Sequence, residues 1–410
     1  MGLFDWLFGA PTLKQVAKEV ETWLRQQHAE DICLKLDMAE ITATLKGRPC
    51  TIYLGNLLAD YRNSPRAGRA ALLERFLSGV TGDNMVPVRW EDAKPLLMPV
   101  VRGRMDLGLG ELSARRTPVA EKPFSGTPHR PLAADLMSDL VVALVCDMPT
   151  SMAYVTEEHL QQWHLGFDEA MEHALQNLRG LPEAQGWREL SPGVWLGEWG
   201  DSYDSSRLLL PDLIHRLGVP EPVLLAPFRN ALMVCSARQP AALLEIAQRV
   251  TAAMDDNPRW LSFEPLRLEG SQWRAHTPPP EVAEALRVLQ QRNLGGAYGS
   301  QKKLLDHIHQ AAQQDVFVAN FQLVRRDAAP ERSFAVWSEG VDTLLPTAEL
   351  IAFVLPRDGQ HEHWLVSWAD VQAIAGALLE PVDLQPRRHR VRRFPDAAML
   401  DQLRERAVEL

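Results

Sequence analysis

Side chains that could carry out acid–base or nucleophilic chemistry gather in the middle of the chain. Residues 200–237 read GDSYDSSRLLLPDLIHRLGVPEPVLLAPFRNALMVCSA, and residues 141–160 read VVALVCDMPTSMAYVTEEHL. Their carboxylates, hydroxyls and guanidinium groups stand beside short apolar runs, and binding sites are often built near strand ends. The predicted candidate pocket consists of Asp147, Tyr154, Asp201, Tyr203, Asp204, Ser205, Ser206, Arg207, Arg229 and Asn230.

Two interpretations of this cluster are open. Ser205 or Ser206 could form a nucleophilic triad with His215 and an aspartate, although triads are recognised by geometry and no G-x-S-x-G turn supports one. Alternatively, Asp201 and Asp204 form Asx-type turns and the serines satisfy exposed backbone groups. The arginines would then pair with local carboxylates. We favour this structural interpretation, because no local motif indicates catalysis.

The apolar pattern predicts the elements that position these residues. The run Leu140–Cys146 has the length of a strand and is apolar throughout, which predicts burial on both faces. Pro211 is well placed to begin a short helix. The other predicted elements of this region are a helix starting at Thr156, a helix at Phe167–Leu178, two strands within Trp187–Trp199, strands at Val223–Ala226 and Ala231–Cys235, and a closing helix through Val250.

Helices and strands also alternate irregularly on either side of this region. The N-terminal part is predicted to hold a helix with a capping box from Thr12 to Gln15, strands at Ile32–Leu36, Glu40–Leu45 and Cys50–Leu54, and a helix at Arg69–Leu77. The C-terminal part is predicted to hold strands within Trp260–Trp273, a helix through Leu289, a break at Gly295-Gly296, a helix capped by Ser300, strands within Val316–Val324, Ser333–Trp337, Leu350–Leu355 and Trp364–Trp368, and a helix from Ser367 to Leu379.

This order of elements predicts an α+β fold with mixed or antiparallel sheets flanked by helices, in two to three domains. The expected divisions are an apolar tip at 1–11, an N-terminal α+β domain at 12–102, a linker at 103–131, a central α+β domain at 132–255 and a C-terminal α+β domain at 256–410. The linker is inferred from its Gly, Pro, Arg and Ser content. Gly108 and Gly110 are not expected to form a phosphate loop, because no helical pattern follows them.

Several spaced blocks resemble a known family. DSYDSSRLLLPDL, PVLLAPFRNALMV, CDMPTSMAYVTEEHL and the helix end from Ala174 to Leu178 are similar to the YtpQ-like family of bacterial proteins of unknown function, over about residues 12–255. One difference is Phe228-Arg229-Asn230, which stands where the family has an Asn-Arg-Asp turn, so a role resting on a carboxylate there does not carry over. The resemblance implies a cytoplasmic bacterial protein and supplies no activity.

Composition limits the classes of protein to consider. A hydrophobic content of 46% with 23% charged residues is ordinary globular usage. Residues 131–254 hold 7 Arg, no Lys and 16 acidic side chains, a charge that repels phosphate backbones and predicts no nucleic-acid binding there. The cysteines, Cys33, Cys50, Cys146 and Cys235, are far apart, which favours a reducing compartment over a disulfide framework. No apolar run near the middle is long enough to span a bilayer.

No metal or other cofactor is predicted. In a strand, His361 and His363 would share one side, whereas His307 and His309 would point apart on a helix. Neither pair has a third ligand at a motif spacing, so solvated side chains are the expected interpretation.

Two further stretches are candidates for contacts with partners. Phe4, Trp6, Leu7 and Phe8 form an apolar N-terminal tip that could dock on a protein or a membrane surface, or fold back on the first domain. Arg387, Arg388, Arg390, Arg392 and Arg393 form a basic cluster. This cluster is interpreted as a charged edge strand, or as a face paired with the acidic central domain, rather than as an RNA site.

The resulting hypothesis is a cytoplasmic, non-catalytic binding or adaptor protein. It is motivated by the absence of a catalytic motif together with the apolar N-terminal tip. The alternative hypothesis is a hydrolase-like enzyme that uses the cluster from Asp201 to Arg207.

Overall fold

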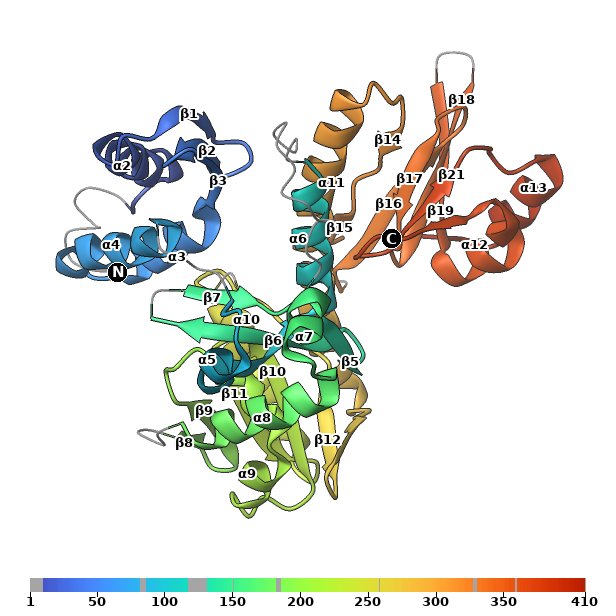
Figure 1. The fold of residues 1–410 in the computed structure, drawn as a ribbon. Coiled ribbons are helices and arrows are strands. Elements are labelled where there is room, and N and C mark those ends of the chain that lie inside the picture. Colours follow the sequence, from blue (N-terminus) through green and yellow to red (C-terminus); the bar gives the residue numbers. More distant parts are fainter. Residues whose placement is uncertain are drawn as a thin grey trace.

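The computed structural model describes residues 10–81, 86–116, 131–149, 151–181, 186–257, 259–326, 330–357 and 360–409. The predicted tip residues Phe4, Trp6, Leu7 and Phe8 lie outside these ranges. The described strands form five separate sheets, mostly antiparallel, with helices packed against them, which confirms the predicted α+β class (Figure 1). None of the described helices combines the length and the hydrophobicity needed to cross a bilayer.

The N-terminal part forms a module with its own core. It contains α2 (Leu13–Gln26), β1 (Glu30–Lys35), β2 (Glu40–Leu45), β3 (Arg48–Tyr53), α3 (Leu54–Asn63) and α4 (Arg69–Thr81). The predicted capping box is confirmed, because the Thr12 amide donates to Gln15 Oε1 at 2.8 Å and the Gln15 amide donates to Thr12 Oγ1 at 3.3 Å. Buried Val16, Val20 and Leu24 of α2 pack against the three-stranded sheet.

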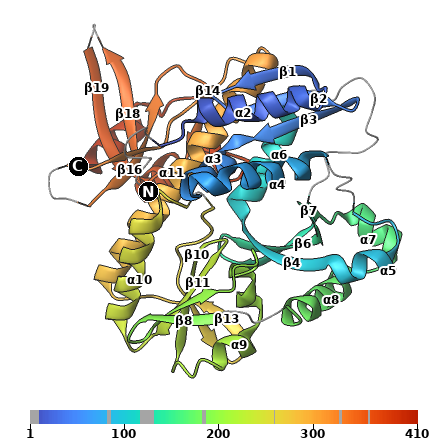
Figure 2. The same ribbon diagram turned by 90° about the vertical axis from the view of Figure 1, so that its left-hand side faces the viewer.

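This module contacts the rest of the chain largely through polar groups. Arg259 Nη2 lies 2.6 Å from Asp60 Oδ2, and the hydroxyls of Tyr53 and Ser113 are 2.8 Å apart. Figure 2 shows the module lying in front of the helices that connect the other parts of the chain.

The first central sheet comprises β4 (Leu97–Gly103), β5 (Ala133–Met137), β6 (Leu140–Met148) and β7 (Ser151–Tyr154). As predicted, every residue of β6 from Leu140 to Cys146 is buried. The strand adjoins two hydrophobic cores. Helices α7 (Glu157–Trp163) and α8 (Phe167–Arg179) contribute to the first core, and residues 199–213 contribute to the second. β4 pairs with β6 along its whole length. The predicted boundary at residue 102 is therefore wrong, because β4 belongs to the central sheet.

The second central sheet has the order β13-β12-β10-β11-β9-β8 and is antiparallel throughout. Its elements and flanking helices are β8 (Gly186–Ser191), β9 (Val194–Glu198), α9 (Pro211–His215), β10 (Pro222–Phe228), β11 (Ala231–Ser236), α10 (Pro240–Ala253), β12 (Leu266–Glu269) and β13 (Gln272–Ala275). Because β12 pairs with β10, the sheet continues past residue 255. The predicted boundary between residues 255 and 256 is therefore also wrong.

A single long helix, α11 (Pro280–Ala311), leads into the C-terminal part. A break at Gly295-Gly296 and a separate helix capped by Ser300 were expected, and both expectations are wrong. A glycine costs about 1 kcal/mol in a helix interior. Here tertiary packing supports the helix on both sides of the glycines, since Leu289 and Tyr298 are buried.

The C-terminal part holds two sheets. One sheet contains β14 (Phe317–Val318), β17 (Thr343–Pro346), β21 (Arg388–Val391) and β20 (Glu380–Val382). The other sheet contains β15 (Gln322–Val324), β16 (Arg332–Ser338), β18 (Leu350–Arg357), β19 (Gln360–Ser367) and β22 (Ala407–Val408). The accompanying helices are α12 (Trp368–Ala375) and α13 (Ala397–Glu405). The predicted cap at Ser367 is confirmed, because its hydroxyl accepts from the Asp370 amide at 3.1 Å.

Among the described residues, the basic cluster makes no ion pair with the acidic central region. β21 lies between β17 and β20, so it is not an edge strand. Arg390 makes two bonds of 2.9 and 2.7 Å to Asp342, and Arg392 lies 3.5 Å from Glu380. Both interpretations of this cluster are therefore wrong, because β21 is an inner strand and the acidic partners of Arg390 and Arg392 belong to the C-terminal part.

The predicted linker 103–131 contains a helix, α6 (Arg104–Arg116). The linker prediction is wrong for these residues. Met105, Leu109 and Leu112 recur at i, i+4 and i+7, which is a helical spacing, but the Gly- and Arg-rich composition around them indicated a linker. Leu112 packs with Leu304 of α11 in a small core. The two helices lie side by side between the central sheets and the C-terminal part (Figure 1).

Gly108 sits where α6 meets the segment before β21. A Cβ atom added there would lie 2.5 Å from Gln385 Cβ and 3.1 Å from the Gln385 carbonyl oxygen. We expect Gly108→Ala to lower the free energy of unfolding by about 1–3 kcal/mol, because α6 and this segment must separate. Gly110→Ala is the matched control, since a Cβ at Gly110 meets no atom within 4 Å. That control should be neutral or stabilising by about 0.5–1 kcal/mol. Urea denaturation of both variants checks the prediction, and equal effects would contradict it.

Candidate functional site

The ten predicted site residues come from two different sheets. Asp147 and Tyr154 lie on β6 and β7 of the first central sheet. Residues 201–207 follow β9 of the second sheet and run into a short 3-10 helix at Ser205–Leu209, and residues 229–230 form the turn between β10 and β11. These side chains are therefore not presented by one common sheet.

Arg207 and Asp201 form an internal ion pair. The Arg207 side chain is only 3% exposed and donates to both Asp201 oxygens, at 2.9 and 2.5 Å. Its guanidinium carbon also lies 4.3 Å from the centre of the Trp199 ring. Burial of Asp201 by itself would raise the pKa of that carboxyl, but the bonds from Arg207 and the Tyr203 amide outweigh this and lower it.

The side chains of Asp201, Asp204 and Ser206 satisfy backbone groups, as the structural interpretation predicts. The prediction is wrong for Ser205, whose buried hydroxyl has no hydrogen-bond partner among the described residues. Asp204 Oδ1 accepts from the amides of Trp199 and Gly200, at 2.6 and 3.2 Å, while burial raises the pKa of this carboxyl. Asp201 Oδ1 accepts from the amide two residues on, at 3.0 Å, which is an Asx-type turn. The buried Ser206 hydroxyl accepts from the amide of Val101 at 3.1 Å.

The triad interpretation finds no support in the described contacts. Ser205 and Ser206 are 1% and 0% exposed. The exposed His215 has its Nε2 atom 2.6 Å from the Gly270 carbonyl oxygen, so its described contact is with a different segment.

Arg102 lies on the same sheet as Asp147 and Tyr154 and belongs to the cluster, although sequence reasoning did not select it. This arginine of β4 is 7% exposed and donates to the Tyr154 hydroxyl at 3.1 Å, while burial lowers its pKa. Burial, and then the nearby Asp147 carboxylate, raises the pKa of Tyr203. A single charged residue within the apolar run LMPVVRG was the available signal.

Arg229 and Asn230 make contacts of their own. Arg229 Nη2 lies 2.9 Å from Asp106 Oδ2 of α6, and Asn230 Oδ1 accepts from the Asn257 amide group at 2.8 Å. Most of the bonds in the cluster are thus local, and the bond between the Ser206 hydroxyl and the Val101 amide joins the segment after β9 to the first central sheet.

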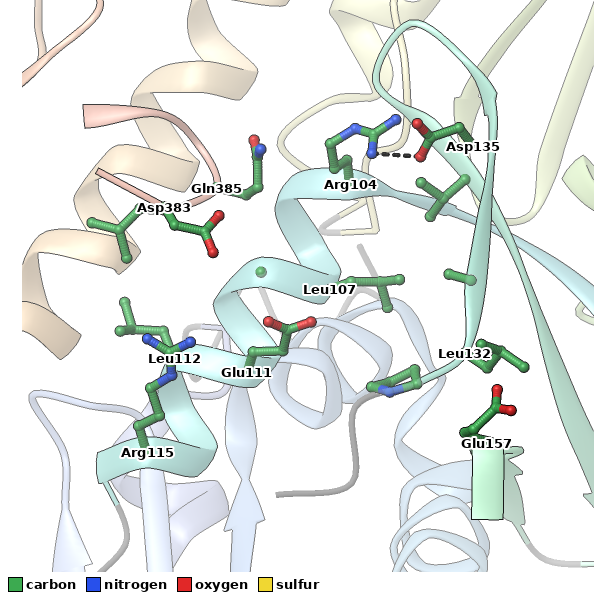
Figure 3. A pocket seen from close by; sticks show the side chains of 15 residues that line it. Arg104, Leu107, Glu111, Leu112, Arg115, Leu132, Asp135, Glu157, Asp383 and Gln385 are labelled. Atoms are coloured by element: carbon green, nitrogen blue, oxygen red, sulfur yellow. Dashed lines mark hydrogen bonds and ion pairs between the residues drawn. The ribbon is translucent and has the colours of Figure 1, made fainter. Parts of the chain in front are cut away.

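A separate pocket opens where α6, β5 and the start of α7 meet the segment that joins β20 to β21 (Figure 3). Its volume is about 520 Å³, within the range of small-molecule sites. We call it the junction pocket. Its lining residues are Arg104, Leu107, Gly108, Glu111, Leu112, Arg115, Pro131, Leu132, Ala133, Asp135, Val141, Glu157, Asp383, Leu384 and Gln385.

The polar lining of the junction pocket is only partly paired. Arg104 Nη1 lies 2.7 Å from Asp135 Oδ1. Among the residues that the structure describes, Glu157 and Asp383 make no side-chain hydrogen bond or ion pair, and both are exposed. None of the ten predicted site residues lines this pocket. Sequence reasoning missed it because its walls come from segments far apart along the chain.

No set of three or more metal-ligating side chains is found within the described ranges. All four cysteines are free thiols, and burial raises the pKa of Cys146 and of Cys235 to about 12, which makes them poor nucleophiles.

Comparison with protein-family models, with curated proteins and with solved structures finds no match to this chain. The resemblance of residues 12–255 to the YtpQ-like family stays a prediction.

Proposed function

We propose that the protein is a non-catalytic binding or adaptor protein and that the junction pocket is its ligand site. One contrast supports this. The side chains with catalytic chemistry, Asp201, Asp204, Ser206 and Arg207, are engaged in internal bonds. The junction pocket, by contrast, has carboxylates without partners among the described residues, where three parts of the chain meet.

The partner side of this proposal rests on the sequence. Phe4, Trp6, Leu7 and Phe8 offer apolar and aromatic contact area of the kind that docks on a protein or a membrane surface. The cytoplasmic placement rests on the scattered cysteines and on the YtpQ-like resemblance. The acidic stretch 131–254 argues against nucleic acid as the partner.

An activity screen tests the non-catalytic assignment against the hydrolase alternative. We expect the wild-type protein to show no saturable turnover of ester, phosphoester or peptide substrates. His215→Ala is the informative variant, because this side chain is exposed and its removal leaves the buried cluster intact. The double variant Ser205→Ala/Ser206→Ala is measured beside it, with circular dichroism to check the fold. Saturable turnover that both variants abolish would overturn the proposal.

A further inference from the structure

The junction pocket has acidic groups on opposite walls. Glu157 is the first residue of α7, and Asp383 lies in the segment that joins β20 to β21. In the view of Figure 3, these two carboxylates flank α6 on either side, with Glu111 between them. Because the walls belong to separate elements, these carboxylates are held apart by the fold.

The charges of the lining do not balance. Four carboxylates and two guanidinium groups line the junction pocket. Arg104 is paired with Asp135 at 2.7 Å. Arg115 stands four residues after Glu111 on α6, a spacing that places the two side chains on one helix face. The lining therefore holds two more carboxylates than guanidinium groups, and neither Glu157 nor Asp383 has a partner among the described residues.

Aliphatic side chains line the same pocket. The apolar lining residues include Leu107, Leu112, Leu132, Val141 and Leu384. A ligand that fits this lining needs a flexible apolar stem with positive charge at both ends. Its stem would cover aliphatic surface, and each charged end would face one carboxylate.

From this arrangement we infer that the junction pocket binds a linear aliphatic polyamine, with one ammonium group near Glu157 and another near Asp383. The inference rests on the proposed binding function and names its ligand class. An anion would be repelled by the net negative lining, and a monoamine would leave one of the two carboxylates without a partner. The proposed contacts are solvent-accessible, so screening by salt weakens them.

Isothermal titration calorimetry with the full chain tests the inference, using putrescine and spermidine as probes. We expect saturable binding to one site, weakened at an ionic strength of about 1 M, where the Debye length is about 3 Å. Butanediol, butylamine and succinate are the matched controls, since they replace the two ammonium groups by neutral groups, by a single charge and by two negative charges. All three should bind more weakly than putrescine.

Variants locate the binding to this pocket. Glu157→Gln and Asp383→Asn should each raise the dissociation constant about threefold to fivefold, the upper part of the range measured for exposed charge pairs. Glu339→Gln is the control, because Glu339 is an exposed acid in the turn after β16, outside the pocket lining. It should leave the dissociation constant unchanged. Both pocket side chains are exposed, so these variants are expected to fold.

Three results with the small-molecule probes would overturn the inference. They are absence of putrescine and spermidine binding, equal binding of putrescine and butylamine, and binding that Glu157→Gln and Asp383→Asn leave unchanged. An acetylated Lys-Ala-Lys peptide that binds more tightly than spermidine and responds to both variants would also overturn it, in favour of a basic peptide. None of these results creates turnover, so failure here is distinguishable from failure of the non-catalytic assignment.

Discussion

Replacing Arg388 by methionine is expected to lower the stability of the C-terminal part by about 3 kcal/mol. The Arg388 side chain is fully buried on β21. Its Nε atom donates to Gln301 Oε1 at 2.6 Å, and Nη1 donates to the carbonyl oxygens of Ala319 and Leu344 at 2.8 and 2.9 Å. The guanidinium carbon lies 5.0 Å from the centre of the Tyr298 ring.

Two opposing contributions to stability decide the size of this effect: the penalty for burying the charge and the gain from its hydrogen bonds. Burial of the charge lowers the pKa of Arg388 to about 10, and its hydrogen bonds go to carbonyl oxygens and to an amide oxygen. The pKa stays above 7, so the side chain remains charged at neutral pH. Hydrogen bonds from a charged donor contribute about 1.5–3 kcal/mol each, and three of them together exceed a desolvation penalty of several kcal/mol. Methionine would also leave buried acceptors without donors.

Native-state hydrogen exchange of the backbone amides in β17 and β21 measures the effect locally. Arg392→Met is the matched control, because Arg392 is 53% exposed and lies 3.5 Å from Glu380. Its opening free energy should change by less than about 0.5 kcal/mol. If both variants exchange like the wild type, Arg388 does not stabilise the contact between α11 and β21.

Arg207→Met should destabilise the central region by about 2–4 kcal/mol, because it leaves the Asp201 carboxylate partly buried without its cation. The Asp201 side chain is 27% exposed, so solvent reduces this penalty relative to a fully buried pair. The variant also removes the contact with the Trp199 ring. Chemical denaturation followed by circular dichroism measures the loss.

The pH dependence distinguishes this ion pair from simple packing. The pKa of Asp201 is lowered in the folded protein, whereas the unfolded value is about 3.9. The stabilisation is therefore present above about pH 3.9 and is lost as the pH falls through the folded-state pKa. The difference in stability between the wild type and Arg207→Met should shrink in that acidic window. A pH-independent difference would indicate that Arg207 acts through packing alone.

A double variant and an exposed control complete this test. In Arg207→Met/Asp201→Asn, no charge is left unpaired, so the loss should be smaller than the sum of the two single losses. Arg188→Met removes an ion pair to Glu198 in which both side chains are about half exposed, at 58% and 48%. It should change stability by less than about 1 kcal/mol.

Local signals predicted much of the secondary structure. The Thr12–Gln15 capping box, the Ser367 cap and the apolar run at Leu140–Cys146 depend on residues close together in the sequence, and the structure confirms each of them. The glycines of α6 and α11 were misleading. Each costs a helix about 1 kcal/mol, and the packing between these two helices offsets that cost.

In the candidate site too, a contact between neighbouring residues was predictable from the sequence, whereas a contact between distant strands was not. Asp201 and Arg207 are six residues apart, so their pairing followed from local turn chemistry. Arg102 became part of the cluster only because β4 pairs with β6 across the predicted domain boundary.

By itself, the sequence determined the α+β class, most of the strands and helix starts, and the structural bonding around residues 201–207. Only the tertiary structure decided where the domains divide and where a pocket opens. The physical reason is distance along the chain. A cap or an apolar run is formed by neighbouring residues, whereas the junction pocket requires Glu111, Glu157 and Asp383 to meet through the packing of α6 against α11 and the close approach of Gly108 to Gln385.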